Sequence, residues 1–464
     1  MSTKRTPRRA VLAGVAAAGL LAACSSGSSG AASGSGSAGA DQKVTISVVS
    51  LIPGSEKAAF DAFDKQVAIF EQKNPNIVVK PQEYQWTGPT FAAQLAGGTL
   101  PTVFEVPFTD GKTLIERGQL ADLTDLVKAL PYGASINPKV LVEMQDAKGN
   151  IFGLPKGAYG IGLQINRTLF KQAGLDPDKP PASWDEIRAD AKTIAAKTGQ
   201  AGFAQMTKSN TGGWMLTTLS YALGGRMETG TGTDAKATVD NPKTKQALQL
   251  LHDMRWNDNS MGSNFLYDWS GINQAFAAGK IGMYMGGSDV YTSLVQQDHI
   301  NPADYGLAKL PLADDPDAGL LGGGTIAVVS PKASAAQKAA AVKWMDYYYE
   351  SKYTDQAAAL LDAQTLAASK QPVGVPSLPL FDKAQLDTYN GWISGQVNVP
   401  LTQMTSFTTG VFEQPLIPEP AAHTQDLYAA LDPVVQAVLT QKDADIGQLL
   451  TAANGRVQAL LAKP

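Results

Sequence analysis

The chain has 464 residues and a formal net charge of −4 at pH 7, with acidic and basic residues interspersed along its length. An apolar content of 44% and a charged content of 17% are typical of a folded globular protein and exclude an intrinsically disordered one. The sequence contains no basic patch or arginine-rich run, which argues against a nucleic-acid partner, and the length predicts two or three domains.

The first 23 residues have the layout of a secretory signal peptide. Basic residues precede an uncharged apolar run from Ala10 to Ala23. That run is shorter than the about 20 apolar residues that span a bilayer. It ends in Leu-Ala-Ala before Cys24, which is the only cysteine in the chain.

The Leu-Ala-Ala-Cys sequence resembles the bacterial lipoprotein signal, in which the cysteine is diacylated and becomes the mature N-terminus. Two or more acyl chains give stable anchoring, because each buried CH₂ contributes roughly 0.8 kcal/mol. The resemblance implies a lipid anchor on Cys24 at the extracytoplasmic face of the cell membrane; the alternative is a plain signal peptide. Arg8-Arg9 is similar to a twin-arginine motif, so both the twin-arginine and the general export route stay open.

Residues 24–40 are predicted to be the lipidated cysteine followed by a flexible tether. Residues 25–40 consist almost wholly of Ser, Gly and Ala. Such a segment has no apolar face to bury and behaves as a random coil. Its r.m.s. reach is on the order of 20–25 Å.

Folded sequence is predicted from Asp41, where strands and helices alternate. Apolar residues at helical spacing predict a helix over 55–70 and a shorter one over 91–96. Runs rich in β-branched residues predict strands at 44–49, 77–79 and 103–106. This alternation favours an α/β domain with a largely parallel sheet.

A second set of elements follows Pro155. A capping-box pattern at Ser183 predicts a helix that runs to about Lys197, and the Pro-rich stretch 371–420 is predicted to be irregular. The other expected elements are helices at 214–223, 242–256, 272–278, 334–350, 425–439 and 445–461, strands at 160–165, 281–285 and 325–330, and an extended run at 305–311.

Six segments occur in an informative order: Phe70–Val79, Leu95–Val103, Gly118–Thr124, Asn166–Phe170, Pro181–Glu186 and Phe276–Met283. Together, over about 44–463, they resemble the extracellular solute-binding proteins that feed sugar ABC importers, the group that includes maltose-binding protein. The family usually has Asp where Thr102 stands. The resemblance is specific to the family and not to a ligand.

The resemblance implies an α/β, two-lobed periplasmic-binding-protein-like fold of type II, whose lobes close on a ligand in the cleft by hinge motion. The expected lobes are 41–155 plus 323–370 and 156–322 plus 371–464, with crossovers near 154–157 and 320–324. The implied function is a lipid-anchored component of an ABC importer that delivers a mono- or oligosaccharide to the permease subunits. A monomer without cofactor or metal is expected.

A sugar has apolar C–H faces and a rim of hydroxyls, so its site needs flat aromatic rings and planar polar groups. By resemblance, the cleft contacts come from loops at the carboxyl ends of strands. Aromatic rings are expected to stack on the sugar, side-chain oxygens to bond its hydroxyls, and glycines to admit backbone N–H groups. The candidates are Ser55, Glu56, Asp110, Tyr159, Trp214, Trp269, Ser288, Asp289, Gly323, Gly324 and Trp392.

Structural roles compete with several of these assignments. Ser55 and Glu56 stand at a predicted helix start, as do Ser288 and Asp289, so helix capping is the alternative for all four. Trp214 lies in an apolar helix, where core packing is the alternative. Trp184 and Trp344 lie in amphipathic helices and are predicted to belong to the core.

Two other functions stay open. In the first alternative, the same fold binds a peptide, polyamine or anion, although no cluster of basic or acidic residues favours such a ligand. The second is a secreted glycoside hydrolase, which needs two carboxylates across a cleft. The acidic residues are scattered, the Gly-x-Ser-x-Gly and His-Glu-x-x-His motifs are absent, and the three histidines lie far apart. The sequence therefore favours a receptor over an enzyme.

Overall fold

The computed structural model describes residues 43–51, 53, 57–84, 88–230, 234–411 and 413–462. From Lys43 onward the chain clusters into one compact unit. The predicted signal peptide, Cys24, the tether, Ser55 and Glu56 lie outside the described residues. Within the described ranges, no helix combines the length and the apolar character that crossing a bilayer requires.

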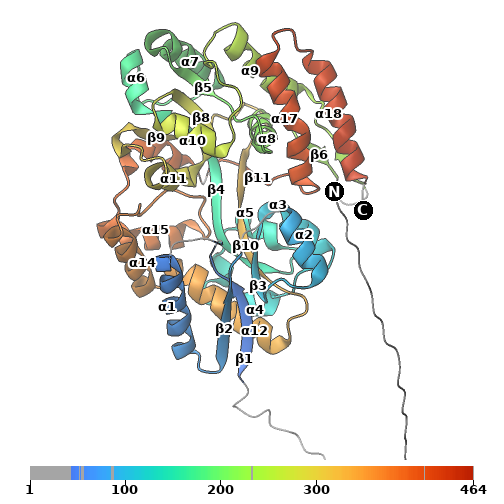
Figure 1. Ribbon diagram of the computed structural model, residues 1–464, viewed down its shortest axis with the longest axis vertical. Helices are drawn as coiled ribbons and strands as arrows, with labels where there is room; N and C mark the ends of the chain where they lie inside the picture. The colour runs from blue at the N-terminus through green and yellow to red at the C-terminus, as the bar shows by residue number, and fades with distance from the viewer. Residues whose placement is uncertain are drawn as a thin grey trace, which may run out of the picture. The chain divides into compact units, whose positions relative to one another are not determined.

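A nine-stranded sheet runs through this unit in the order β2-β1-β3-β10-β4-β8-β5, with β11 on β10 and β9 on β4 (Figure 1). The strands are β1 Val44–Val49, β2 Ile77–Gln82, β3 Val103–Pro107, β4 Gly153–Asn166, β5 Ala201–Ala204, β8 Ile281–Gly287, β9 Tyr305–Lys309, β10 Leu320–Val329 and β11 Leu416–Ile417. A separate pair consists of β6 Glu228–Thr229 and β7 Lys236–Ala237.

The sheet is mixed. The parallel pairing predicted for the first three strands is confirmed, because β1 runs parallel to β2 and to β3. In contrast, β10 is antiparallel to both β3 and β4, and β4 is antiparallel to β8 and β9. The α/β class is confirmed. Parallel pairing occurs among the strands near the N-terminus and in the β5–β8 and β10–β11 pairs, so the sheet as a whole is not largely parallel.

The long central strands β4 and β10 connect the two groups of strands. Their pairing extends from Gly153 opposite Val328 to Gly160 opposite Gly322. The register shifts between Thr325 and Ile326, which leaves Lys156 as an extra residue in β4. This bulge accommodates Pro155, which lacks the N–H that a regular ladder needs. The crossovers expected near 154–157 and 320–324 thus fall within these two strands.

Helices cover the sheet and fill the space beyond its ends (Figure 1). Their bounds are α1 Lys57–Lys73, α2 Gly88–Gly97, α3 Phe108–Glu116, α4 Thr124–Lys128, α5 Pro138–Leu141, α6 Arg167–Ala173, α7 Trp184–Thr198, α8 Thr211–Ala222, α9 Pro242–Trp256, α10 Trp269–Ala277, α11 Tyr291–Gln296, α12 Ala335–Met345, α13 Ser351–Thr354, α14 Gln356–Ala368, α15 Lys383–Ile393, α16 Thr405–Gly410, α17 Thr424–Thr440 and α18 Ile446–Leu461.

Helix capping follows the sequence closely. The Ser183 side chain accepts a bond from the Glu186 N–H, as predicted, but the Glu186 carboxylate reaches past Ser183 to the Ala182 N–H. A reciprocal capping box occurs instead at Ser334 and Gln337, at the start of α12. Such caps satisfy N–H groups that the helix itself leaves without partners.

The stretch 371–420 is not irregular throughout, and that prediction is wrong. It contains α15, α16 and β11. Asp382 caps α15 by accepting a bond of 2.9 Å from the Gln385 N–H. The prolines lie between these elements, where a residue without an N–H interrupts no helix.

Aromatic side chains pack α1 against α12. Trp344 is fully buried, stacks on Tyr348 with ring centroids 5.0 Å apart, and meets Phe70 edge to face at 5.2 Å. Such aromatic pairs contribute about 0.5–1.5 kcal/mol beyond their buried area. The predicted core role of Trp344 is confirmed, and Trp184 packs half-buried against the same core.

Candidate functional site

A cavity of about 200 Å³ lies beside the central strands. Its walls come from the junction of β3 and α3, from β4 and β10, from the start of α8, and from the chain that leads into α17. The lining residues are Pro107, Thr109, Tyr159, Ser209, Asn210, Thr211, Trp214, Gly324, Glu419, Gln425 and Tyr428. The structure thus brings together three of the predicted residues, Tyr159, Trp214 and Gly324.

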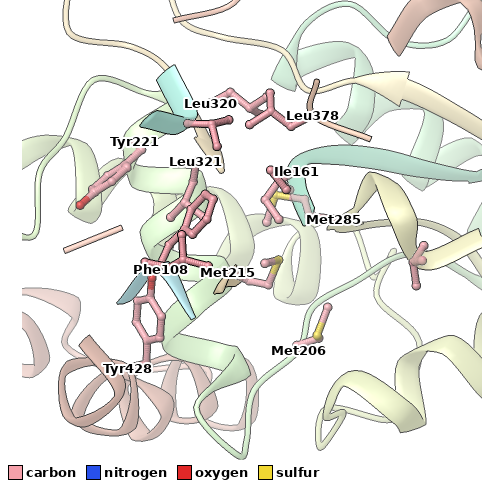
Figure 2. Close-up of a cluster of buried hydrophobic side chains, with 14 of the residues drawn as sticks. Phe108, Ile161, Met206, Met215, Tyr221, Met285, Leu320, Leu321, Leu378 and Tyr428 are labelled. Carbon is pink, nitrogen blue, oxygen red and sulfur yellow. The ribbon is translucent and has the colours of Figure 1, made fainter. Parts of the chain in front are cut away.

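An apolar cluster adjoins the cavity and shares Tyr428 with its lining. Figure 2 shows Phe108 of α3, Leu321 of β10 and Tyr428 of α17 converging with Met215 of α8 and Ile161 of β4. All five side chains are buried. Because close-packed side chains resist displacement, this cluster holds the walls of the cavity in fixed positions.

Two aromatic residues form one side of the cavity. The rings of Tyr159 and Trp214 meet edge to face, with centroids 6.0 Å apart and an interplanar angle of 83°. Trp214 is half-buried and also packs against the core, so the core role considered for it is confirmed, while its exposed part lines the cavity. Its Nε1 is buried without a hydrogen-bond partner among the described residues. That N–H is therefore available to a ligand oxygen.

Glu419 and Tyr428 supply the polar counterpart. The Tyr428 hydroxyl donates a bond of 2.9 Å to the Glu419 carboxyl group. Burial, opposed by this bond and reinforced by the nearby Glu143 and Asp110 carboxylates, raises the pKa of Glu419 to about 8. Near pH 8 both protonation states of this group are therefore populated, so it can accept or donate a hydrogen bond, and at lower pH it is mainly protonated.

Asp110 lies in the first turn of α3, next to the lining residue Thr109. Its Oδ2 and the Thr109 Oγ1 are both buried without a partner among the described residues. Burial raises the pKa of Asp110 to about 6. Both residues were expected in a loop after β3 but lie in α3, which begins directly after that strand, and only Thr109 lines the cavity.

Three helices begin at the cavity, and their first N–H groups carry partial positive charge. They are α3, α8 and α17, whose first turns contribute the lining residues Thr109, Thr211 and Gln425. At α8, Asn210 adopts a left-handed conformation with φ 69°. The Asp432 carboxylate accepts bonds of 2.7 Å from the Asn210 N–H and 2.9 Å from the Gly213 N–H.

Two of the three glycines of β10, Gly323 and Gly324, make room for side chains of the site. A Cβ on Gly323 would lie 2.3 Å from the Tyr159 hydroxyl oxygen. A Cβ on Gly324 would lie 2.4 Å from the Gly157 carbonyl oxygen and 2.6 Å from the Phe108 ring. The sequence argument assigned these glycines to ligand contact, and the structure supplies a second reason, which is the close approach of Tyr159 and Phe108.

Ser288 and Asp289 follow β8 in a short 3₁₀ turn, Ser288–Val290. Neither lines the cavity. Ser288 is fully buried, and its Oγ has no partner among the described residues. The Asp289 carboxylate lies near Tyr159, whose pKa it raises together with burial and Glu419. The capping role considered for both residues is not seen, because this turn has no side-chain cap.

The structure does not place Trp269 or Trp392 among the lining residues. Trp269 begins α10 and packs half-buried against the main core. Trp392 packs instead on a separate small cluster of Ala359, Ala363 and Ile393 between α14 and α15. Trp392 was expected to cover the cleft from an irregular segment. That segment forms α15, which directs Trp392 to the small cluster instead.

Sequence reasoning missed Glu419, Tyr428, Asn210 and Gln425. Glu419 stands between Pro418 and Pro420, in a stretch that offered no motif. Flanking prolines favour an extended backbone, and this was the one local signal that Glu419 is held in place.

A larger cavity of about 840 Å³ lies elsewhere, between the end of α7, the loop 259–264 and α10. It borders Ala201 and Lys280, at the amino ends of β5 and β8. Ligands of open α/β sheets bind outside the carboxyl ends of strands. The smaller cavity, not the larger one, is therefore the candidate site.

Comparison with known proteins places this geometry in context. A family model described as "Bacterial extracellular solute-binding protein" matches residues 53–355. Among curated proteins, the chain is 26% identical over 197 residues to the sn-glycerol-3-phosphate-binding periplasmic protein UgpB of Yersinia pestis. That match covers 40% of this chain and 44% of the relative, so the chain spans less than half the length of the curated relative.

Solved structures show the same fold. The cyclic alpha-maltosyl-1,6-maltose binding protein of Arthrobacter globiformis matches with a TM-score of 0.69 and 20% identity, over 90% of this chain and 99% of that one. UgpB of Mycobacterium tuberculosis, in complex with glycerophosphocholine, matches with a TM-score of 0.68 and 18% identity, over 90% and 98% of the two chains. Both comparisons confirm the α/β, two-lobed binding-protein fold.

Proposed function

Because the chain belongs to the bacterial extracellular solute-binding protein family, as its sequence resemblance predicted, we propose that it is the substrate-binding component of an ABC importer and captures a carbohydrate in the 200 Å³ cavity. The observation that carries the proposal is the shared lining of the Tyr159–Trp214 aromatic pair and the polar Glu419, Asn210 and Gln425. Flat apolar surface beside hydrogen-bonding groups suits a sugar ring and its hydroxyls. The family is one of binding proteins and not of enzymes.

The proposed mechanism is closure of two lobes about β4 and β10. The lobes are 41–155 plus 323–370 and 156–322 plus 371–464. The bulge at Lys156 and the glycines of β10 support a hinge there, since both weaken a regular ladder. Ligand contacts to both lobes favour the closed form, which the permease then selects.

The proposed location is the extracytoplasmic face of the cell membrane, with a lipid anchor on Cys24. The cysteine after Leu-Ala-Ala and the extracellular nature of the family support this. Membrane fractionation of the native protein and of Cys24→Ala tests it. Wild-type protein in the membrane fraction and Cys24→Ala in the soluble fraction would agree with the anchor, whereas identical fractionation would contradict it.

Thermal unfolding of the mature protein against a panel of mono- and oligosaccharides tests the carbohydrate assignment. A ligand at 100 times its dissociation constant adds about 2.7 kcal/mol of stability. A shift with one sugar class, with the sugar recovered intact, supports a receptor and names its ligand. A flat panel redirects the search to peptides, polyamines and anions, and cleaved sugar would instead indicate a glycoside hydrolase.

A further inference from the structure

We propose that the cavity selects an uncharged sugar or polyol and excludes phosphate esters and other anions, with Asp110, Glu419 and Asp432 as the specificity determinants. The inference rests on the proposed function in assigning the ligand to this cavity. It separates the chain from relatives whose names specify sn-glycerol 3-phosphate.

The first observation is the lack of cations. No Lys, Arg or His is found among the described residues that line the cavity. Nearby cations already face acids: Lys208 lies 3.2 Å from Asp268, and Lys112 lies 3.9 Å from Glu143. The internal positions outside the described residues, 52, 54–56, 85–87, 231–233 and 412, are also free of basic residues in the sequence. Arg and Lys side chains usually bind phosphate oxygens in proteins, and the described lining of this cavity contains neither.

The second observation concerns the helix N-termini, which are the usual alternative to basic side chains for holding an anion. Three helices start at this cavity, and a carboxylate of the protein lies within or just before the first turn of each, or bonds its first N–H groups. Asp432 accepts the Asn210 and Gly213 N–H groups at α8. Glu228 accepts the Ala421 and Ala422 N–H groups just before α17.

At the third start, Asp110 lies in the first turn of α3. The positive ends of α3, α8 and α17 are therefore offset by the protein's own acids. An incoming phosphate has to displace a carboxylate or sit beside one.

The third observation is that negative charge on Glu419 is already unfavourable in this cavity. The pKa of Glu419 is raised by burial and by the Glu143 and Asp110 carboxylates. A partly buried site screens such repulsion less than bulk salt solution does. A sugar hydroxyl meets no such repulsion, since it can donate to a carboxylate or accept from the Trp214 N–H. Selection by repulsion of the wrong ligand is a general route to specificity.

Isothermal titration of the mature protein with its sugar, the phosphate monoester of that sugar, sn-glycerol 3-phosphate and glycerophosphocholine tests the proposal. We expect each phosphate compound to bind at least tenfold more weakly than the neutral sugar. At pH 9, where Glu419 is ionised, we also expect Glu419→Gln to narrow that gap, while Asp61→Asn, which removes an exposed carboxylate of α1, leaves it unchanged. Equal or tighter binding of any phosphate compound would overturn the exclusion and leave a sugar-binding function standing.

A second measurement needs no ligand and so separates failure of the inference from failure of the proposed function. The fluorescence of Trp214, taken as the difference between wild type and Trp214→Phe, is quenched with iodide, caesium and acrylamide at pH 9, where Glu419 is ionised. We expect caesium and acrylamide to quench it more than iodide, and Glu419→Gln to raise iodide quenching. Equal quenching by iodide and caesium would overturn the inference even where no sugar binds.

Discussion

The Lys156 ammonium lies 2.7 Å from the Glu105 carboxylate, and Lys156 is the extra residue of the β4 bulge. The other oxygen of Glu105 accepts a bond of 2.8 Å from the Tyr349 hydroxyl. Glu105 of β3 thus links the bulge to the π-helical turn Asp346–Glu350 that follows α12. One carboxylate fixes three segments beside the proposed hinge.

Removing that charge should loosen all three segments. Glu105→Gln loses the ion pair and weakens the Tyr349 bond, so we expect the free energy of unfolding to fall by about 1–3 kcal/mol. Urea denaturation followed by circular dichroism measures it. Asp61→Asn breaks an exposed pair with Lys57 and should cost no more than about 0.5 kcal/mol. A similar loss in the two variants would show that Glu105 is no more than a surface charge.

Trp214 offers the sharpest test of the site. We expect Trp214→Ala to weaken sugar binding at least tenfold, about 1.4 kcal/mol, without unfolding the protein, because the ring lines the cavity and meets Tyr159. Trp214→Phe, which keeps an aromatic face, should lose less. Titration calorimetry gives both affinities. If Trp214→Ala binds as the wild type does, the ring serves the core alone.

Gly323 leaves no space for a side chain. A Cβ there would lie 2.3 Å from the Tyr159 hydroxyl oxygen, so Gly323→Ala should push the Tyr159 ring out of place, at a cost of about 1–3 kcal/mol in stability together with weaker sugar binding. Thermal unfolding and titration test both. Gly391→Ala, in α15 with nothing within 4 Å of the new Cβ, should be neutral or stabilising. Full affinity in Gly323→Ala would contradict the close-approach argument.

Glu419 should make stability depend on pH. Its pKa in the folded protein is about 8, above the ordinary value of 4.5, so the folded state binds more protons than the unfolded state between these values. Its stabilising contribution is complete below about pH 4.5 and is lost as the pH rises through 8, by on the order of 5 kcal/mol at most. Denaturation at a series of pH values, for wild type and Glu419→Gln, should show a flatter profile for the variant. Parallel profiles would mean that Glu419 titrates normally.

Local patterns predicted about half of the described α-helices and most strands of the nine-stranded sheet, because their signals lie within a few residues. The helix 242–256 matches α9 at both ends, since Asn241 caps it and Pro242 occupies its first position. The fold followed from the order of many such segments. The predicted irregularity of 371–420 failed because prolines report where helices stop and not how many helices lie between them.

The site was only partly predictable. The strand-end rule selected Asp110, which lies just after β3, and the expected crossover near 154–157 selected Tyr159, which lies within β4. Glu419 reaches the cavity only because α17 packs against α8, with Asp432 bonded to Gly213. A contact between segments so distant in the chain leaves no trace in the local sequence of either one.

The position of β10 at the centre of the sheet has a consequence for how the chain matures. One edge of β3 pairs with Thr325–Val329 of β10, so this edge stays unpaired until most of the chain is present. Val103, Phe104 and Val106 of β3 are fully buried in the finished fold. A chain that crosses a membrane with its N-terminus first would hold this open, aggregation-prone edge throughout the passage. Export of the finished fold would avoid that interval, which makes the choice of export route a question of folding order as well as of targeting.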